Sequence, residues 1–94
     1  MGVSIKNKIS IIIRTKNEEK WIARCLRSIN SQIVLAEIEI IIVDNNSSDG
    51  TLKVAERIGV SKIINIDKFL PGKALNDGIN VSSGDYIVCL SAHC

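Results

Sequence analysis

The sequence predicts an α/β fold, a Rossmann-like three-layer sandwich in which helices cover both faces of a mainly parallel sheet. Short runs of Ile, Val and Leu alternate with segments of helical periodicity, which gives the element order βαβαβαβ. The main apolar runs are nearly continuous, as in strands buried on both faces of a parallel sheet. The length of 94 residues suits one domain, so we expect a single domain over residues 1–94.

Four apolar runs are the candidate strands. Residues 9–13 and 38–43 are rich in Ile and Val, residues 62–66 form a weaker run, and residues 86–90 form the fourth. Hydrophobic residues make up 46% of the chain and aromatic residues only 3%, so the core has to be built from aliphatic side chains. Such a core is typical of a parallel sheet, and the short connections favour right-handed crossovers.

Three helices are expected between these strands. Asn17 is the expected N-cap of the first, whose apolar side chains recur at spacings of three and four. These recurring positions are Trp21, Ile22, Cys25, Leu26 and Ile29. The second helix covers about residues 51–58 and ends at Gly59, a favourable residue after a helix. The third begins near residues 71–72, and its expected inward-facing residues are Ala74, Leu75, Gly78 and Ile79.

Charge and cysteine content argue against several classes of protein. The 12 basic and 10 acidic residues give a net charge of +2, which is too balanced to indicate nucleic acid or an anionic membrane as a partner. Cys25, Cys89 and Cys94 form no CxxC pair, so we expect reduced thiols, two of them packed as small apolar side chains, rather than a zinc site. Because no signal peptide or run of ~20 apolar residues occurs, we expect a soluble, cytoplasmic chain.

Polar residues gather after the expected strands, at residues 14–17, 44–48, 67–70 and 91–94. In parallel α/β sheets, ligands bind at these carboxyl ends. Asp44 directly follows an apolar strand, and we favour a ligand role because such a carboxylate accepts hydrogen bonds from a base or a ribose. For Asp49 we favour the simpler role of capping a turn and a helix. Residues 14–17 fit a ligand-binding role and a purely structural role, in which they end the strand and cap the helix, equally well.

The segment at residues 69–78 combines a glycine-containing turn with a helix N-terminus, whose free N–H groups and dipole favour a phosphate. Lys73 would add a positive charge for a diphosphate. Neither GxGxxG nor GxxxxGKS/T occurs, so the sequence supports neither a dinucleotide site nor a P-loop. Asn76, one turn further on, is more typical of a hydrogen-bonding helix face than of a ligand site.

Five blocks, taken together and in this order, resemble the N-terminal part of a family-2 inverting glycosyltransferase with the GT-A fold. They are SIIIRTKNEE at 10–19, CLRSINSQ at 25–32, VDNNSSDGT at 43–51, GKALNDGI at 72–79 and SGDYIVCL at 83–90. The resemblance covers nearly the whole chain, from Ser10 to Cys94. It implies the fold of a nucleotide-diphospho-sugar transferase and a nucleotide-sugar site at the carboxyl ends of the strands.

The resemblance assigns donor-binding roles residue by residue. The nucleoside of the sugar donor would lie against Arg14, Thr15, Asn17, Asp44 and Asn45. The family usually has a second aspartate where this chain has Asn45; an amide both donates and accepts, so it could still read a pyrimidine edge. Lys73 stands where the family often has a basic residue near the diphosphate, and the remaining expected donor-binding residues are Asn76 and Ser91.

The family's metal-binding motif, Asp-x-Asp, falls on residues 91–93, where this chain has Ser-Ala-His. The last aspartate usually holds Mn²⁺ or Mg²⁺, so His93 stands at the metal position. An imidazole binds Mn²⁺ less well than a carboxylate does. Four interpretations stay open: His93 binds a metal, it contacts the diphosphate as a cation, the site works without metal, or His93 has no ligand role.

The resemblance implies transfer of a sugar from a nucleoside diphosphate sugar to a hydroxyl of a glycan or a lipid-linked saccharide. The catalytic base would lie beyond Cys94, so this chain alone is expected to be inactive. Contact with the inner face of a membrane is expected only through further parts of the protein. One alternative is a non-catalytic module that binds a nucleotide or a partner on the same fold. A nucleotidyltransferase is a weaker alternative, since residues 14–19 contain no glycine.

Overall fold

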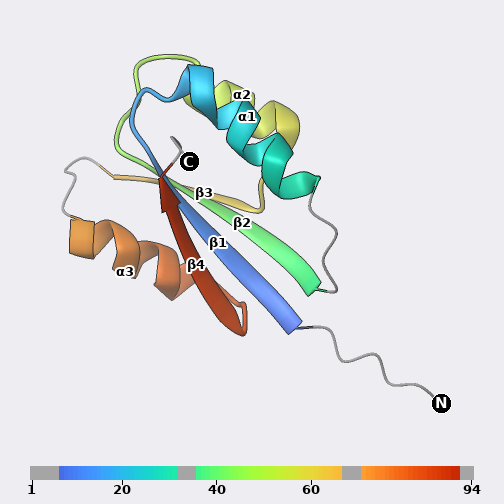
Figure 1. The fold of residues 1–94 in the computed structure, drawn as a ribbon. Helices are drawn as coiled ribbons and strands as arrows, with labels where there is room; N and C mark the ends of the chain where they lie inside the picture. The colour runs from blue at the N-terminus through green and yellow to red at the C-terminus, as the bar shows by residue number, and fades with distance from the viewer. Residues whose placement is uncertain (1–6, 32–35, 67–70, 92–94) are drawn as a thin grey trace.

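A computed structural model describes residues 7–31, 36–66 and 71–91, without the side chains of residues 7, 36, 71–75 and 91. Seven elements follow one another in the predicted order (Figure 1). They are β1 (Asn7–Thr15), α1 (Glu19–Asn30), β2 (Ala36–Asp44), α2 (Thr51–Ile58), β3 (Lys62–Asn65), α3 (Pro71–Val81) and β4 (Tyr86–Ser91). The α/β fold class is confirmed.

The strands form one parallel sheet in the order β3-β2-β1-β4. The central strands β1 and β2 are longer than their apolar runs, because polar residues at both ends also pair across the sheet. Thr15 lies opposite Asp44, Arg14 lies opposite Ser91, and Asn65 lies opposite Asp44. This register brings the carboxyl ends of all four strands to one edge of the sheet.

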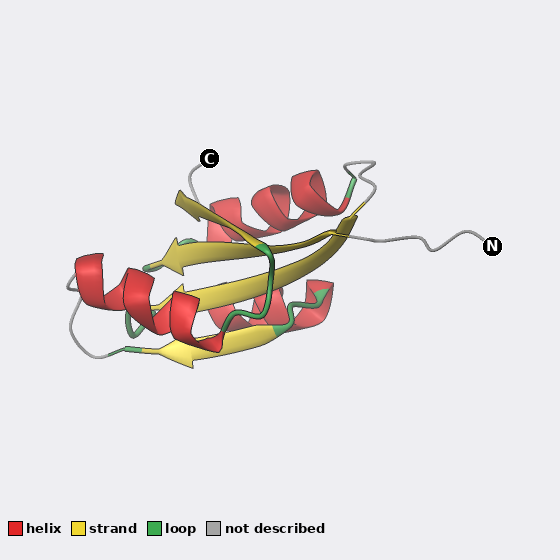
Figure 2. Cartoon of the chain, turned by 90° about the horizontal axis from the view of Figure 1, so that it is seen from below, coloured by secondary structure: helices red, strands yellow, loops and turns green. Residues whose placement is uncertain are grey.

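Two apolar clusters fill the three-layer sandwich. Helices α1 and α2 lie on one face of the sheet and α3 on the other (Figure 2). Alternate residues of the same Ile run serve both faces: Ile11 and Ile13 pack under α1 and α2, whereas Ile12 packs on the side of α3. This explains why the runs in β1 and β2 are continuous.

Three residues of the expected core can be compared with the structure. Ile79 is 38% exposed, so the prediction that it faces inward is wrong, and Trp21, one of the recurring apolar positions of α1, is 44% exposed. Trp21 lies on the flank of α1, because Ile22, Cys25 and Leu26 already occupy the stripe that meets the sheet. Gly78 is buried as predicted, and an added Cβ would come within 2.7 Å of Ile12 Cγ2, so α3 packs close to β1.

The free cysteines of the described residues differ in environment, since Cys25 is buried and Cys89 is exposed on β4. Cys94 lies outside the described residues. No helix in the described part of the chain is long and apolar enough to cross a bilayer.

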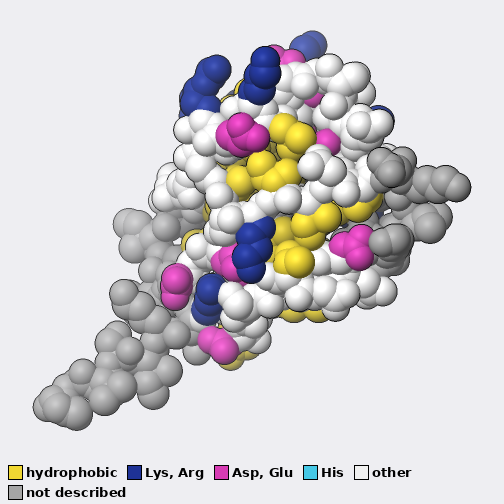
Figure 3. Space-filling view, turned by 180° about the vertical axis from the view of Figure 1, so that it is seen from behind, with side chains coloured by type: hydrophobic (Ala, Val, Ile, Leu, Met, Phe, Trp, Pro, Cys, Tyr) yellow, Lys and Arg dark blue, Asp and Glu magenta, His cyan; other side chains and the backbone are white. Residues whose placement is uncertain are grey.

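The outer surface of α1 and α2 is rich in cations. Figure 3 shows Lys and Arg side chains projecting from the upper part of the molecule, where Figure 1 places these two helices. The exposed basic residues of the two helices are Lys20, Arg24, Arg27, Lys53 and Arg57.

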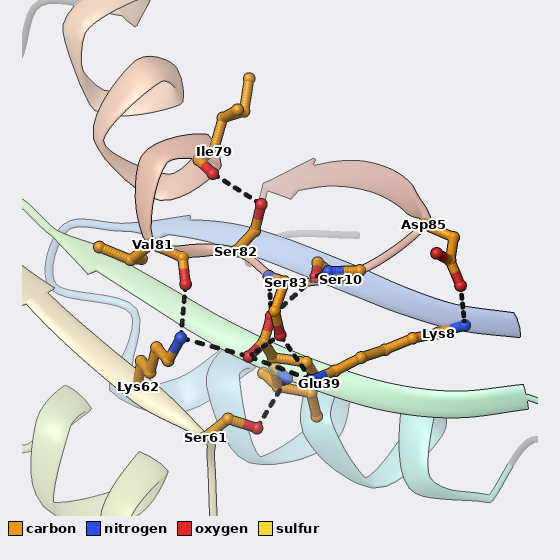
Figure 4. A network of polar contacts seen from close by, with 12 residues as sticks. Lys8, Ser10, Glu39, Ser61, Lys62, Ile79, Val81, Ser82, Ser83 and Asp85 are labelled. Carbon is orange, nitrogen blue, oxygen red and sulfur yellow. Dashed lines mark hydrogen bonds and ion pairs between the residues drawn. The ribbon is translucent and has the colours of Figure 1, made fainter.

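A buried carboxylate organises the edge of the sheet where the strands begin, opposite the edge that carries their carboxyl ends (Figure 4). Glu39 of β2 is 6% exposed and accepts hydrogen bonds from the Ser10 hydroxyl at 2.7 Å and from the Ser83 N–H at 2.9 Å. Lys62 Nζ lies 3.4 Å and Lys8 Nζ 3.9 Å from its Oε2 atom. The Ser83 N–H is the largest cause that lowers the pKa of Glu39 to about 2, and the Ser10 and Lys62 contacts add to it against the opposing effect of burial.

This cluster fixes the start of β4. The Gly84 N–H donates to the Ser10 hydroxyl at 2.8 Å, and the Asp85 N–H donates to the Lys8 carbonyl at 2.7 Å. An added Cβ on Gly84 would lie 2.6 Å from the Ser10 backbone nitrogen, so the approach requires glycine. The connection from α3 to β4 is therefore hydrogen-bonded to β1 and β2 at the start of β4, and β4 then runs toward the carboxyl ends of the neighbouring strands.

Candidate functional site

The tips of β1 and β2 are joined through Asp44. Its carboxylate accepts a hydrogen bond from the Thr15 hydroxyl at 2.5 Å between Oγ1 and Oδ1. The backbone continues the pairing one residue further, because the Asn45 N–H donates to the Thr15 carbonyl at 2.9 Å. Asp44 is fully buried and Thr15 is 3% exposed. The two strand ends therefore form one unit.

Ser47 closes the turn after β2 onto the same carboxylate. Its N–H donates to Asp44 Oδ2 at 2.8 Å, and its hydroxyl donates to Oδ1 at 2.6 Å. The Ser47 oxygen also accepts the Asn17 N–H at 2.8 Å. Asp44 thus uses both oxygens within the chain and sets the shape of the turn, while a direct contact between this carboxylate and a ligand stays a prediction.

Asn17 ties the turn after β1 to the turn after β2. Its backbone has a φ of 51°, a left-handed conformation that asparagine tolerates. Its Oδ1 atom accepts the N–H groups of Ser48 at 2.8 Å and Asp49 at 3.4 Å. The prediction that Asn17 is the N-cap of α1 is wrong: Glu18 occupies that position without a side-chain capping bond, and the amide of Asn17 serves the neighbouring loop instead.

Asp49 joins the beginnings of α1 and α2, although the N-cap position of α2 itself is Gly50. Its carboxylate accepts the Thr51 N–H at 3.0 Å, the Thr51 hydroxyl, and the Glu19 N–H at 3.2 Å. The hydroxyl of Thr51 is the main cause that lowers the pKa of Asp49. In return, Glu19 Oε1 accepts the Gly50 N–H at 3.0 Å, so each helix start supports the other.

Two cations belong to the β1 end of the site. Lys16 is exposed, and its Nζ donates to the Asn46 carbonyl at 3.3 Å. Asn46 has a φ of 51°, which turns the chain sharply after Asn45. Arg14 is half-buried and lies opposite Ser91 across the β1–β4 pairing. Positive charge therefore lies beside the turn that follows β2, residues 44–49, here called the acidic turn.

The predicted site residues fall into two groups. Arg14, Thr15, Asn17, Asp44 and Asn45 lie together at the tips of β1 and β2. The others lie on α3 and β4 or beyond: Lys73 in the first turn of α3, Asn76 exposed one turn later, Ser91 at the end of β4 and His93 outside the described residues. Of this second group, the register places Ser91 beside the first group, next to Arg14.

Ser47 and Thr51 are site residues that sequence reasoning missed. Thr51 is fully buried, and its Oγ1 atom accepts the Glu18 N–H at 2.8 Å. A signal for both existed, because Ser and Thr two or three residues after an aspartate favour turns closed by side-chain hydrogen bonds. Their partners on the β1 side depend on the sheet register, which the sequence does not specify.

The described part of the site does not fit a metal ion. Within residues 7–31, 36–66 and 71–91, no group of three His, Cys, Asp or Glu side chains could hold one. The Asp44 carboxylate, the nearest candidate ligand, is already occupied by Thr15 and Ser47. The predicted ligand His93 lies outside the described residues.

The open parallel sheet with helices on both faces belongs to the Rossmann-like class of folds. In this class ligands such as nucleotides bind at the carboxyl ends of the strands, where this chain has the acidic turn and two cations. The sequence profile of "Glycosyl transferase family 2" matches residues 10–94, and the chain belongs to this family. The resemblance to family-2 enzymes of the GT-A fold is thereby confirmed.

Two relatives illustrate the match. A dolichyl N-acetyl-α-D-glucosaminyl phosphate 3-β-D-2,3-diacetamido-2,3-dideoxy-β-D-glucuronosyltransferase from Methanococcus voltae is 37% identical over 94 residues, which cover 93% of this chain. Glycosyltransferase AglE from Haloferax volcanii is 32% identical over 92 residues, which cover 92% of this chain. The matched segments span 29% and 30% of the two relatives, so this chain covers under a third of their length.

Solved structures agree with this assignment. Residues 1–349 of TarS from S. aureus, in complex with UDP-GlcNAc, align with a TM-score of 0.79 and 28% identity over 92% of this chain and 26% of that one. Glucosyl-3-phosphoglycerate synthase from Mycobacterium tuberculosis, solved with Mn²⁺, UDP and glucosyl-3-phosphoglycerate, aligns with a TM-score of 0.77 and 25% identity. That alignment covers 92% of this chain and 33% of the synthase.

Proposed function

We propose that the protein is the donor-binding part of a glycosyltransferase. In this proposal a nucleoside diphosphate sugar binds at the carboxyl edge of the sheet, and its sugar passes to a hydroxyl of an acceptor. Membership of glycosyl transferase family 2 supports the reaction class. The similar structures solved with UDP-GlcNAc and with UDP support the class of donor.

The Asp44 network carries the proposal. Hydrogen bonds from Thr15 and Ser47 to one buried carboxylate hold two loops from different strands in a single arrangement. A site that is ordered before the ligand arrives loses less entropy on binding. Because Asp44 is engaged within the chain, we assign direct recognition of the base to the partly exposed Asn45, whose amide both donates and accepts.

We assign the diphosphate to the cations around this turn. Arg14 and Lys16 supply positive charge at the end of β1, and Lys73 lies in the first turn of α3, where the helix dipole also favours an anion. Asn76 and Ser91 complete the proposed set of donor-binding residues. A divalent ion, Mn²⁺ or Mg²⁺, enters this proposal only through His93.

An inverting transfer needs a base that removes the proton of the acceptor hydroxyl and a site that stabilises charge on the leaving diphosphate. We assign the second task to this chain and the base to residues beyond Cys94 in a longer protein. The acceptor is a glycan or a lipid-linked saccharide, the class that the name of the Methanococcus relative indicates. We place the reaction in the cytoplasm, at the inner face of the membrane.

Thermal unfolding of the protein with UDP, GDP, CDP and dTDP, each with and without Mn²⁺, tests this function. A ligand at about 100 times its Kd stabilises the folded state by about 2.7 kcal/mol. In a domain of this size, each kcal/mol raises Tm by about 4–8 °C. We expect one diphosphate to raise Tm clearly more than the others. If millimolar concentrations of all four leave Tm unchanged, donor binding by this chain alone is contradicted, and the result favours a non-catalytic module on the same fold or a site that needs further parts of the protein.

A further inference from the structure

The near-neutral charge of the whole chain conceals an uneven distribution. Helices α1 and α2 together carry five basic and two acidic residues, whereas the rest of the chain carries seven basic and eight acidic residues. The excess of positive charge therefore lies on the two helices that cover one face of the sheet (Figure 3).

The five cations form an outward-facing surface, here called the basic helix face: Lys20, Arg24, Arg27, Lys53 and Arg57. All five are exposed, and none of their side chains forms a hydrogen bond or ion pair with any residue that the structure describes. Of the two acidic residues, Glu19 is bonded to the Gly50 N–H, which leaves Glu56 as the acidic side chain among these cations. Five uncompensated cations over two adjacent helices create a positive surface potential.

Trp21 adds an apolar group to this surface. Its side chain is 44% exposed, and it lies one helical turn before Arg24, so the two residues are neighbours on α1. Indole rings concentrate at the boundary between lipid headgroups and water, where one part of the ring is in an apolar environment and another is hydrated. A tryptophan beside a row of Lys and Arg is the composition of a helix that lies flat on an anionic bilayer.

We propose that the basic helix face docks on an anionic lipid bilayer. Its side chains come from two helices that pack against each other. A cavity in the described part of the chain is lined by Glu56 and residues 59–63, at the end of α2 and the start of β3, and its lining includes none of the α1 cations. Single-stranded nucleic acid would need several stacking aromatic rings, and Trp21 is the aromatic residue of these two helices. Charge and the single indole therefore favour a lipid surface over nucleic acid.

Docking in this way positions the candidate site. The helix α1 begins at Glu19, two residues after Asn17, and α2 begins at Thr51, directly after the acidic turn. A bilayer under the two helices would therefore lie beside the carboxyl edge of the sheet, with the donor site at its border. This inference does not depend on the proposed function, because it rests only on the charge and exposure of the helices.

The fluorescence of Trp21, the single tryptophan of the chain, measures this docking directly. The protein is titrated with vesicles of phosphatidylcholine containing about 30% phosphatidylglycerol, and with pure phosphatidylcholine vesicles. We expect a blue shift of Trp21 emission with the anionic vesicles and none with the neutral ones. Raising the salt concentration to about 1 M shortens the Debye length to about 3 Å and should release the protein.

Two double variants of equal charge separate the basic helix face from net charge. Arg24→Gln/Arg27→Gln removes two charges from it, whereas Asn65→Asp/Asn80→Asp lowers the net charge equally at exposed positions on β3 and α3. We expect the first to weaken vesicle binding at least tenfold and the second less than threefold. Lys53→Gln/Arg57→Gln repeats the test on α2, and far-UV circular dichroism checks that each variant is folded.

Three results would overturn the proposal: equal binding to neutral and anionic vesicles, equal weakening by the α1 variant and the Asn65/Asn80 variant, or binding to polyuridylic acid without binding to vesicles. The last result would assign the surface to nucleic acid.

Discussion

At the scale of single residues, Ser47 links the most segments of the candidate site. It donates twice to Asp44 and accepts the Asn17 N–H, so one hydroxyl connects the ends of β1 and β2. The hydroxyls of Thr15 and Ser47 both donate to the buried Asp44 carboxylate. Loss of a single partner leaves the others desolvated without compensation.

Ser47→Ala is therefore expected to destabilise the protein by about 0.5–1.5 kcal/mol, because it removes the protein acceptor of the Asn17 N–H at the surface and one donor to the buried Asp44 Oδ1. Ser48→Ala is the matched control, since its hydroxyl makes only a 3.4 Å contact with Asn17 Oδ1 at the surface. Urea unfolding at neutral pH measures both. Equal losses in the two variants would show that the Asp44 network does not stabilise the turn.

At the scale of elements, the Glu39 cluster positions β4. Among the strands that the structure describes, β4 lies at the edge and pairs with β1 alone, and Tyr86 is 59% exposed, so little apolar burial holds β4 in place. The bonds from Ser83 and Gly84 to Glu39 and Ser10 fix its beginning. Because β4 ends at Ser91 beside Arg14, the cluster also influences the geometry at the opposite edge.

Glu39→Gln should lower stability at neutral pH by about 1–3 kcal/mol, with the difference from the wild type depending on pH. The pKa of Glu39 is lowered from 4.5 to about 2 in the folded protein, so its stabilisation is complete above about pH 4.5 and disappears as the pH falls toward 2. The Tm values of wild type and variant should therefore converge over this range. Glu37→Gln, an exposed position on the same strand, should show no such convergence. A constant difference from pH 7 to pH 2 would contradict this account.

The sequence predicted the elements better than the contacts between them. The apolar pattern located every strand and helix of the described residues. The runs of β1 and β2 are buried, whereas most of the apolar run of β4 is exposed. The pattern misplaced Ile79 and included Trp21, both of which lie at the margins of their helical stripes, where one residue's rotation decides between burial and exposure. The charged Glu39 within an apolar strand was a signal of a buried polar cluster, but its partners lie 29 and 44 residues away.

For the candidate site, the sequence located the polar strand ends but not their connections. Asn17 looked like a helix cap because asparagine precedes the helix, yet its amide holds the backbone of Ser48 in the neighbouring loop. Asp44 was expected at a strand tip, and the sequence did not show that the Ser47 and Thr15 hydroxyls both bond to its carboxylate. The contact of Asn17 with Ser48 follows from the pairing of β1 with β2, whereas the bonds between Ser47 and Asp44 are local to the turn after β2.

At the scale of the whole molecule, folding separates what the composition averages. The net charge of +2 gave no indication of a charged partner, whereas the fold gathers five cations on one helical layer and places the acidic turn at the edge of the sheet. The same fold leaves β4 at a sheet edge in a chain that corresponds to 29% of its Methanococcus relative. The proposed donor site therefore belongs to a unit that is smaller than the proteins it resembles.

The central claim is that the carboxyl edge of the sheet binds a nucleoside diphosphate. Titration of the ¹⁵N-labelled protein with UDP and with GDP, followed by amide chemical shifts, tests it most directly. We predict that the largest shifts fall on residues 14–17 and 44–48, while amides near Glu39 and on the outer side of α2 stay unchanged. Shifts confined to the amino-terminal end of the sheet or to the basic helix face would contradict the claim.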